Sequence, residues 1–401
     1  MKNKILFLFF IFFAFESFAD DDDDDSEDKL LPLSFVGEEK ADKRFSNRLV
    51  TDIGFNDNYQ TTDKDGQYKE TFARARFYSK FDFGKNFSFN SQINLSPFNS
   101  GTQDNGVVVA NSGGNRFFQD EGIFIRQLNL QYNDKKHSFI VGKFNLNYGK
   151  AWKWDRGIWG YELANNYRMV DKIGLGTVYR TGNAKKTGQY DFGFSVFKND
   201  RKYLDNSIIA QNDSFTKSDA KAGDSSLLQS YLASMDVSFD FGEKEKLTYN
   251  FAYINLAVNS RATAVAQNKL ADQKGYVFGM NYLYPVTANY DIDAMVEYNN
   301  FENVDGNSDV SERYFTGSVV NKFYRNYLTT LVYSRRSNKN ASQLGFEQEL
   351  SEISVGYEFD KNSFFDRFII QTGYKNIRNN YKDYIQTNNA FGVLVRYYKN
   401  F

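Results

Sequence analysis

The 401-residue chain has no cysteine, three prolines and one histidine. Without cysteine it can form no disulfide scaffold, thiol nucleophile or thiolate metal site. Proline cannot donate a hydrogen bond to a central β-ladder, and Pro32, Pro97 and Pro285 all fall outside the strands we expect. The single histidine, His137, follows a short predicted turn, so a histidine-dependent hydrolase is disfavoured. The sequence predicts a protein that is not an enzyme and holds no cofactor or metal.

Long apolar runs are lacking beyond the first residues, and mean hydropathy is −0.60. Residues 1–19 combine a start containing Lys2 and Lys4, an apolar core and a small-residue ending, which predicts a secretory signal peptide. That core falls short of the ~20 apolar residues that a membrane-spanning helix needs. A helical membrane protein is therefore excluded. A membrane β-barrel is not, because its strands need apolar residues only at every second position.

The net charge of −1 conceals an asymmetry along the chain. Residues 20–28 read DDDDDDSED, with acidic groups and no basic ones, and the Asp20–Asp25 run has no obvious role. Blocks of like charge usually stay disordered. We expect residues 20–45 to form an acidic, flexible periplasmic leader, followed by one domain over residues 46–401. No nucleic-acid-binding motif stands out, so no nucleic acid partner is expected.

Alternation of apolar and polar residues recurs from residue 46 onward in segments of about ten residues. These segments predict about sixteen strands, with fourteen or eighteen as the alternatives. The expected strands are roughly 49–56, 73–83, 87–96, 123–132, 137–144, 173–180, 190–197, 231–241, 247–253, 276–284, 290–299, 313–323, 327–335, 350–359, 368–377 and 386–401. Connections after odd strands are mostly long and those after even strands mostly short. This is typical of a transmembrane antiparallel up-and-down β-barrel with long external loops and short periplasmic turns.

The last expected strand carries the clearest alternation. Phe391, Val393, Val395, Tyr397 and Phe401 share one face, interrupted only at position 399, and the other face is mostly polar. Such a strand fits a closed barrel in lipid, where its apolar face meets the membrane. A terminal phenylalanine preceded by alternating apolar residues resembles the C-terminal signature of Gram-negative outer-membrane proteins. That resemblance implies recognition by the barrel-assembly machinery, with Tyr397 and Phe401 as the signal.

Two expected strands supply charges to the inward face. Arg74, Arg76 and Lys80 share one parity, and a bare charge on the lipid face near mid-membrane costs ~2–4 kcal/mol. We interpret them as a basic pore wall, because fixed charge along a pore sets ion preference. The opposite sign is supplied by the expected pore-lining acids Asp291, Asp293 and Glu297.

The third long connection, residues 145–171, holds all three tryptophans. Large apolar side chains are unusual on an exposed loop, so we expect this connection to fold into the lumen and constrict it. An aromatic belt at the outer interface is the alternative. The constriction candidates are Trp152, Trp154, Asp155, Arg156, Trp159 and Glu162.

Arg126 shares its parity with expected lipid-facing leucines. Either a bulge switches the face there or the guanidinium extends to the outer rim, and the sequence leaves both open.

Residues 46–401 as a whole resemble the sixteen-stranded Gram-negative porins. Phe72–Asn90 (FARARFYSKFDFGKNFSFN) and Phe139–Gly149 (FIVGKFNLNYG) are similar to strands of phosphate-selective O/P-type porins, although the usual proline of the second motif is absent. The resemblance implies an inward third loop whose acids, here Asp155 and Glu162, face basic wall residues. It also implies a homotrimer in the outer membrane, with lipid and lipopolysaccharide around it.

Together these features favour a passive channel for small hydrophilic solutes and ions, with a mild anion preference. A substrate-selective channel for phosphate or sugars is one alternative, and a structural or adhesive barrel with an occluded lumen is another.

Overall fold

The computed structural model describes most of the chain from residue 44 onward. The described residues are 44–62, 67–97, 103–104, 107–108, 115–118, 121–153, 156–200, 222–224, 227–242, 244–258, 270–340, 345–359, 367–382 and 384–401. The predicted signal peptide (1–19), the predicted leader up to residue 43, and Trp154 and Asp155 lie outside these residues.

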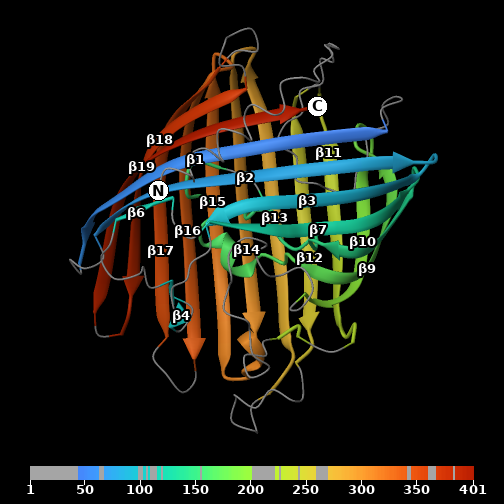
Figure 1. Cartoon of the computed structure of the whole chain (residues 1–401), viewed down its shortest axis with the longest axis horizontal. Coiled ribbons are helices and arrows are strands. Elements are labelled where there is room, and N and C mark those ends of the chain that lie inside the picture. The colour runs from blue at the N-terminus through green and yellow to red at the C-terminus, as the bar shows by residue number, and fades with distance from the viewer. Residues whose placement is uncertain are drawn as a thin grey trace.

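Sixteen antiparallel strands form a closed barrel (Figure 1). They are β1 (Phe45–Thr61), β2 (Tyr68–Phe83), β3 (Phe87–Pro97), β7 (Glu121–Asn133), β8 (His137–Phe144), β9 (Lys172–Asn183), β10 (Gly188–Asn199), β11 (Ser230–Asp240), β12 (Lys246–Leu256), β13 (Gln273–Thr287), β14 (Tyr290–Glu302), β15 (Val310–Phe323), β16 (Tyr327–Asn340), β17 (Phe346–Glu358), β18 (Phe368–Asn380) and β19 (Ile385–Asn400). The ring closes where β1 pairs with β19, from Arg48 opposite Asn400 to Thr61 opposite Asn388.

Short elements accompany this ring. They are β4 (Gln103–Asp104), β5 (Val107–Val108), β6 (Arg116–Phe117), which pairs parallel with β2, and the 3-10 turns η2 (Ala164–Tyr167) and η4 (Val304–Gly306). No helix among the described residues is long and apolar enough to cross a membrane.

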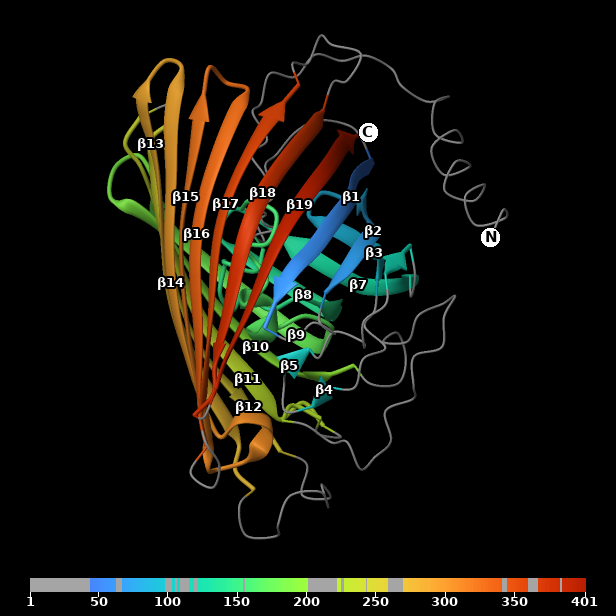
Figure 2. The same ribbon diagram turned by 90° about the vertical axis from the view of Figure 1, so that its left-hand side faces the viewer.

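Alternation along each strand separates an apolar outer face from a mixed inner face. On β17, Ile353 and Val355 are each 49% exposed, while Leu350, Glu352 and Ser354 between and beside them are buried. The same pattern of exposed large apolar residues recurs around the ring. Side chains alternate across a strand, so the exposed apolar set forms the surface that meets lipid. Figure 2 shows β13 to β19 side by side as one wall of the barrel.

The predicted antiparallel β-barrel and its strand set are confirmed, whereas the inward third loop stays a prediction. The expectation that every proline avoids a strand is wrong for two of them, because Pro97 ends β3 and Pro285 lies inside β13. The β13–β14 register shifts between Pro285 and Thr287. Such an irregularity is the setting in which a ladder tolerates a residue without an N–H.

Arg126 lies at a bulge, which decides between the two alternatives. In the β3–β7 pairing Gln92 opposes Gln127, whereas Ile93 opposes Ile125, so Arg126 is the extra residue. A bulge lets neighbouring residues switch faces. Arg126 accordingly points inward, with its guanidinium 4.5 Å from the centroid of the Phe124 ring.

The face assignment predicts a large difference between two adjacent substitutions on β3. Ile93→Arg places a charge on the lipid face and should destabilise the barrel by about 2–4 kcal/mol. Asn94→Arg, the matched control, faces the polar lumen beside Gln92 and should cost far less. Denaturant unfolding of the two proteins in the same detergent or bilayer measures the difference. Equal destabilisation would contradict the assignment.

Candidate functional site

The segment of residues 145–171 joins β8 to β9 and contacts inward side chains on many other strands. Its partners are Arg74 on β2, Asp236 on β11, Asn281 on β13, Asp293, Glu297 and Asn299 on β14, Glu352 on β17 and Lys375 on β18. These strands occupy widely separated positions in the ring. One connection therefore links several parts of the inner face.

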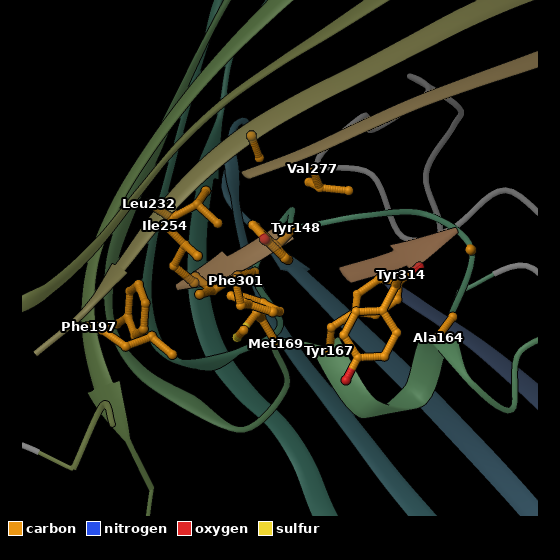
Figure 3. Close-up of a cluster of buried hydrophobic side chains, with 14 of the residues drawn as sticks. Tyr148, Ala164, Tyr167, Met169, Phe197, Leu232, Ile254, Val277, Phe301 and Tyr314 are labelled. Atoms are coloured by element: carbon orange, nitrogen blue, oxygen red, sulfur yellow. The ribbon is translucent and has the colours of Figure 1, made fainter. Parts of the chain in front are cut away.

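The base of the segment packs into a large apolar cluster with the inner faces of β10 to β15. We call this the larger cluster, and its members are Ile140, Phe144, Leu146, Tyr148, Ala151, Ala164, Tyr167, Met169, Phe197, Ala222, Leu232, Ala252, Ile254, Leu256, Val277, Met295, Phe301 and Tyr314. Figure 3 shows Tyr167 lying against Tyr314 and Tyr148 beside Phe301. Their ring centroids are 5.0 Å and 5.6 Å apart. Burial of this apolar area fixes the base of the segment to one side of the barrel.

Two phenols of the larger cluster also donate hydrogen bonds to β14. The Tyr148 hydroxyl donates to Asn299 Oδ1 (2.8 Å), and the Tyr167 hydroxyl donates to Glu297 Oε1 (2.5 Å). Burial raises the pKa of both phenols well above its ordinary value. Both therefore stay protonated donors at any physiological pH.

The tip of the segment, residues 156–163, packs into a separate smaller cluster. Its members are Ile158, Trp159 and Leu163 of the tip, together with the wall residues Phe72 on β2, Leu350 on β17, Ile377 on β18 and Leu394 on β19. The Trp159 indole lies against Gly392, where an added Cβ would come within 2.4 Å of Cζ2. Trp159 thus occupies space that a larger residue on β19 would fill.

Ion pairs along the segment change polarity between Arg156 and Glu162. Lys150 Nζ lies 3.0 Å from Asp236 Oδ2, and Arg156 Nη2 lies 2.8 Å from Asp293 Oδ1. Farther along, Glu162 Oε2 lies 2.7 Å from Lys375 Nζ. Basic groups of the segment therefore face acids on β11 and β14, and an acid of the segment faces a base on β18.

A buried ionic cluster lies where the two ends of the segment join β8 and β9. Lys143 Nζ lies 3.2 Å from Asp171 Oδ1 and 3.1 Å from Asp200 Oδ2, and Arg126 Nη1 lies 2.5 Å from Asp171 Oδ2. Two cations and two carboxylates balance in charge. Buried charges are tolerated when paired in this way.

The three predicted basic wall residues face inward, but each has a partner. Arg74 donates to the Tyr161 hydroxyl and lies over the Phe72 ring (4.4 Å). Arg76 Nη2 lies 3.4 Å from Asp52 Oδ2, and Lys80 Nζ lies 3.0 Å from Asp82 Oδ1. The wall is therefore less strongly basic than the bare sequence indicates.

The predicted acids on β14 have different surroundings. Asp293 and Glu297 contact the segment as described above. Asp291 has a buried Oδ1 with no hydrogen-bond partner among the described residues. The structure therefore brings only two of the three to the segment.

Trp152, Phe401 and Tyr397 are the remaining predicted site residues in the described part of the chain. The Trp152 indole N–H donates to the Tyr148 carbonyl oxygen (2.9 Å), so Trp152 braces the base of the segment. Phe401 exchanges backbone hydrogen bonds with Asn47 (2.8 and 2.9 Å), and its ring lies 6.3 Å from that of Phe77. The Tyr397 ring lies 4.9 Å from that of Phe368. Both terminal residues take part in closing the barrel, and their role as an assembly signal stays a prediction.

Several charged contact residues were missed from the sequence, among them Asp52, Asp236, Glu352, Lys375 and Arg396. Each lies on the inner parity of a predicted strand, and that signal alone could have found them. Arg396 Nε lies 2.6 Å from Asp52 Oδ1, so Asp52 pairs with two guanidinium groups.

His137 fits a turn rather than a reactive site. Its Nδ1 lies 3.4 Å from Asp134 Oδ1. The same carboxylate accepts backbone N–H bonds from Lys136 and His137, and these bonds lower the pKa of Asp134. Among the described residues no group of three or more metal-ligating side chains is present.

Comparison with known proteins shows the fold. No family model matches the sequence, and no curated protein matches it. Outer-membrane expressed OmpT of Vibrio cholerae superposes with a TM-score of 0.50 at 13% identity, over 90% of this chain and 100% of that one. The outer membrane channel DcaP of Acinetobacter baumannii gives 0.50 at 14% identity, over 88% and 96%. These comparisons support an outer-membrane porin-like barrel, and the resemblance to phosphate-selective porins in particular stays a prediction.

The chain is a sixteen-stranded transmembrane β-barrel with the fold of these outer-membrane proteins. Its lipid-facing band and closed ring are the physical basis, because only a closed barrel satisfies every strand backbone within a bilayer.

Proposed function

We propose that the protein is a porin, a passive diffusion channel for small hydrophilic solutes and ions, in which residues 145–171 narrow the lumen. One observation carries the proposal: inside a closed sixteen-stranded ring, one connection is held to opposite parts of the inner face by two apolar clusters and three ion pairs. A ring of this strand number leaves an aqueous channel unless it is filled. The similar barrel of DcaP is an outer membrane channel, which supports the same class of function here.

A mild anion preference is the finer part of the proposal. Arg74 donates to a neutral phenol, and Arg76 and Arg396 both approach the carboxylate of Asp52. Three guanidinium groups therefore gather on the inner face of β2 and β19, and they support the proposed preference. Fixed charge on a pore wall selects counter-ions.

The proposal includes further features of the chain. They are export by the signal peptide 1–19, an acidic leader over residues 20–45, recognition of Tyr397 and Phe401 by the assembly machinery, and a homotrimer surrounded by lipid and lipopolysaccharide. No catalytic group is required. A phosphate- or sugar-selective channel is the second candidate, and the Arg74 guanidinium beside the Tyr161 ring supports it.

Reversal potentials in planar bilayers test the channel and its preference together. The wild type should conduct, and the triple replacement Arg74→Gln, Arg76→Gln and Lys80→Gln should shift the reversal potential toward cations. Lys85→Gln, in the exposed β2–β3 turn, is the control and should leave the potential unchanged. An unchanged potential in the triple variant removes these residues from the ion path, and the absence of conduction overturns the channel itself.

A pH effect should arise within the segment. Burial, followed by the neighbouring Lys150 charge, lowers the pKa of Lys153 to about 7. Lys153 thus gains positive charge as the pH falls through 7, and anion preference should rise between pH 8 and pH 6. Lys153→Met should reduce this change, measured as the pH dependence of the reversal potential. An identical pH dependence in the variant would exclude Lys153 as its source.

A further inference from the structure

Two short turns of the 145–171 segment bind a wall carboxylate in the same way. At the first, the backbone N–H groups of Lys150 and Ala151 donate to Glu297 (2.5 and 3.3 Å). At the second, the N–H groups of Ile158 and Trp159 donate to the two oxygens of Glu352 (2.6 and 2.9 Å). Successive backbone N–H groups in a turn form a concave anion site. The segment thus presents two anion sites to two strands.

A glycine precedes each pair of donors, and its conformation explains the arrangement. Gly149 and Gly157 both have φ of +69°, in the left-handed region that favours glycine. A Cβ on Gly157 would lie 2.1 Å from Glu352 Oε1, and one on Gly149 would lie 2.9 Å from Glu297 Oε1. Each carboxylate therefore sits where any other residue would place its side chain.

The two sites differ in what surrounds them. Glu297 also accepts the Tyr167 hydroxyl and lies against the larger cluster, so the base of the segment is held by many contacts. The tip is held by the smaller cluster, the Arg156–Asp293 and Glu162–Lys375 pairs and the Arg74–Tyr161 contact. With fewer apolar neighbours at the tip, the Glu352 carboxylate contributes a larger share of its attachment.

We propose that Glu352 and Gly157 form a releasable latch for the tip of the constriction, residues 156–163, while Glu297 and Gly149 form its fixed anchor. This rests on the proposed channel function. Glu352→Gln removes the negative charge and replaces one of the two acceptor oxygens with an amide nitrogen. That nitrogen donates hydrogen bonds and cannot accept them from the N–H groups of the turn. The tip then leaves the wall of β17 to β19 while the base stays in place, and the channel widens.

Thiol labelling tests the latch without relying on conduction. The chain has no cysteine, so Leu163→Cys places a single buried thiol in the tip. In the full-length folded barrel, Glu352→Gln should increase its labelling rate about tenfold or more, because opening exposes the thiol. Glu358→Gln removes a carboxylate from the same strand that pairs with Lys322, and should leave the rate unchanged. Equal rates in the wild-type and Glu352→Gln backgrounds would overturn the latch.

A double-mutant comparison tests whether Gly157 and Glu352 act as one contact. Gly157→Ala should accelerate labelling like Glu352→Gln, and the two together should add little to either alone. Glu352→Gln combined with Gly149→Ala should be additive, because they disrupt different sites. Independent effects of Gly157 and Glu352 would contradict the shared contact. Heat-modifiable migration in gels confirms that every variant is folded.

Conductance then separates this inference from the channel function. If the wild type conducts, Glu352→Gln should raise single-channel conductance about twofold and admit larger neutral polymers. Faster labelling without any conduction in the wild type would support the latch and refute the channel. Conduction with unchanged labelling would support the channel and refute the latch.

Discussion

Asp52→Ala is expected to destabilise the barrel by about 3–5 kcal/mol, because it removes the carboxylate that pairs with a buried guanidinium. Asp52 and Arg396 oppose each other across the β1–β19 seam, and both are 3% exposed. Their side chains meet at 2.6 Å, and Arg76 approaches the second oxygen. The seam joins residues 344 apart in sequence. Denaturant unfolding followed by tryptophan fluorescence measures the loss.

Asp57→Ala is the matched control for the seam. Asp57 lies on the same strand and pairs with Lys69 at 3.6 Å in an exposed setting, so its loss should cost less than about 1 kcal/mol. Replacing Asp52 and Arg396 together with apolar residues of similar volume should recover most of the stability. If Asp52→Ala and Asp57→Ala lose the same free energy of unfolding, the buried Asp52–Arg396 pair contributes no more to closure of the barrel than the Asp57–Lys69 pair does.

Trp159→Ala is expected to detach the tip of the segment, at a local packing cost of about 3–5 kcal/mol. Trp159 is buried in the smaller cluster and its indole nitrogen has no hydrogen-bond partner among the described residues. Its contribution is therefore packing, aided by the Lys375 ammonium 5.1 Å from the ring centroid. Single-channel conductance should rise, because the tip no longer rests on β19.

Two further substitutions test whether the increase in conductance depends on packing of the tip. Trp159→Phe keeps much of the packing and should stay near the wild-type conductance. Trp152→Ala alters the half-buried base, where the larger cluster holds the segment, and should change conductance less than Trp159→Ala. A larger effect at Trp152 would mean that the base, rather than the tip, controls the pore.

The strands could be predicted because their physical cause is local. Alternation on a segment such as 391–401 follows directly from one lipid-facing side and one wet side. The bulge at Arg126 was visible only as a broken parity, because its position depends on the pairing with β3. Pro285 inside β13 was missed for the same reason, since a register shift belongs to two strands rather than one.

The candidate site was predicted as a set of residues but not as a set of pairs. Glu162 and Arg74 were expected to face each other across the pore. Instead Glu162 pairs with Lys375, 213 residues away, and Arg74 meets Tyr161. Such pairs depend on which wall positions the segment reaches, and no local pattern encodes that distance. The two glycine turns were likewise hidden, because their ligands lie on β14 and β17.

The most direct test of the channel is the effect of a charged thiol reagent on single-channel current through a Glu162→Cys variant. Glu162 lies at the tip of the segment with its side chain 38% exposed, so a modified thiol there should obstruct the ion path and lower the current in steps. Phe278→Cys, on the lipid face, should show no change. An unchanged current when the thiol at position 162 is modified, or a wild-type barrel that never conducts, would contradict a channel narrowed by residues 145–171.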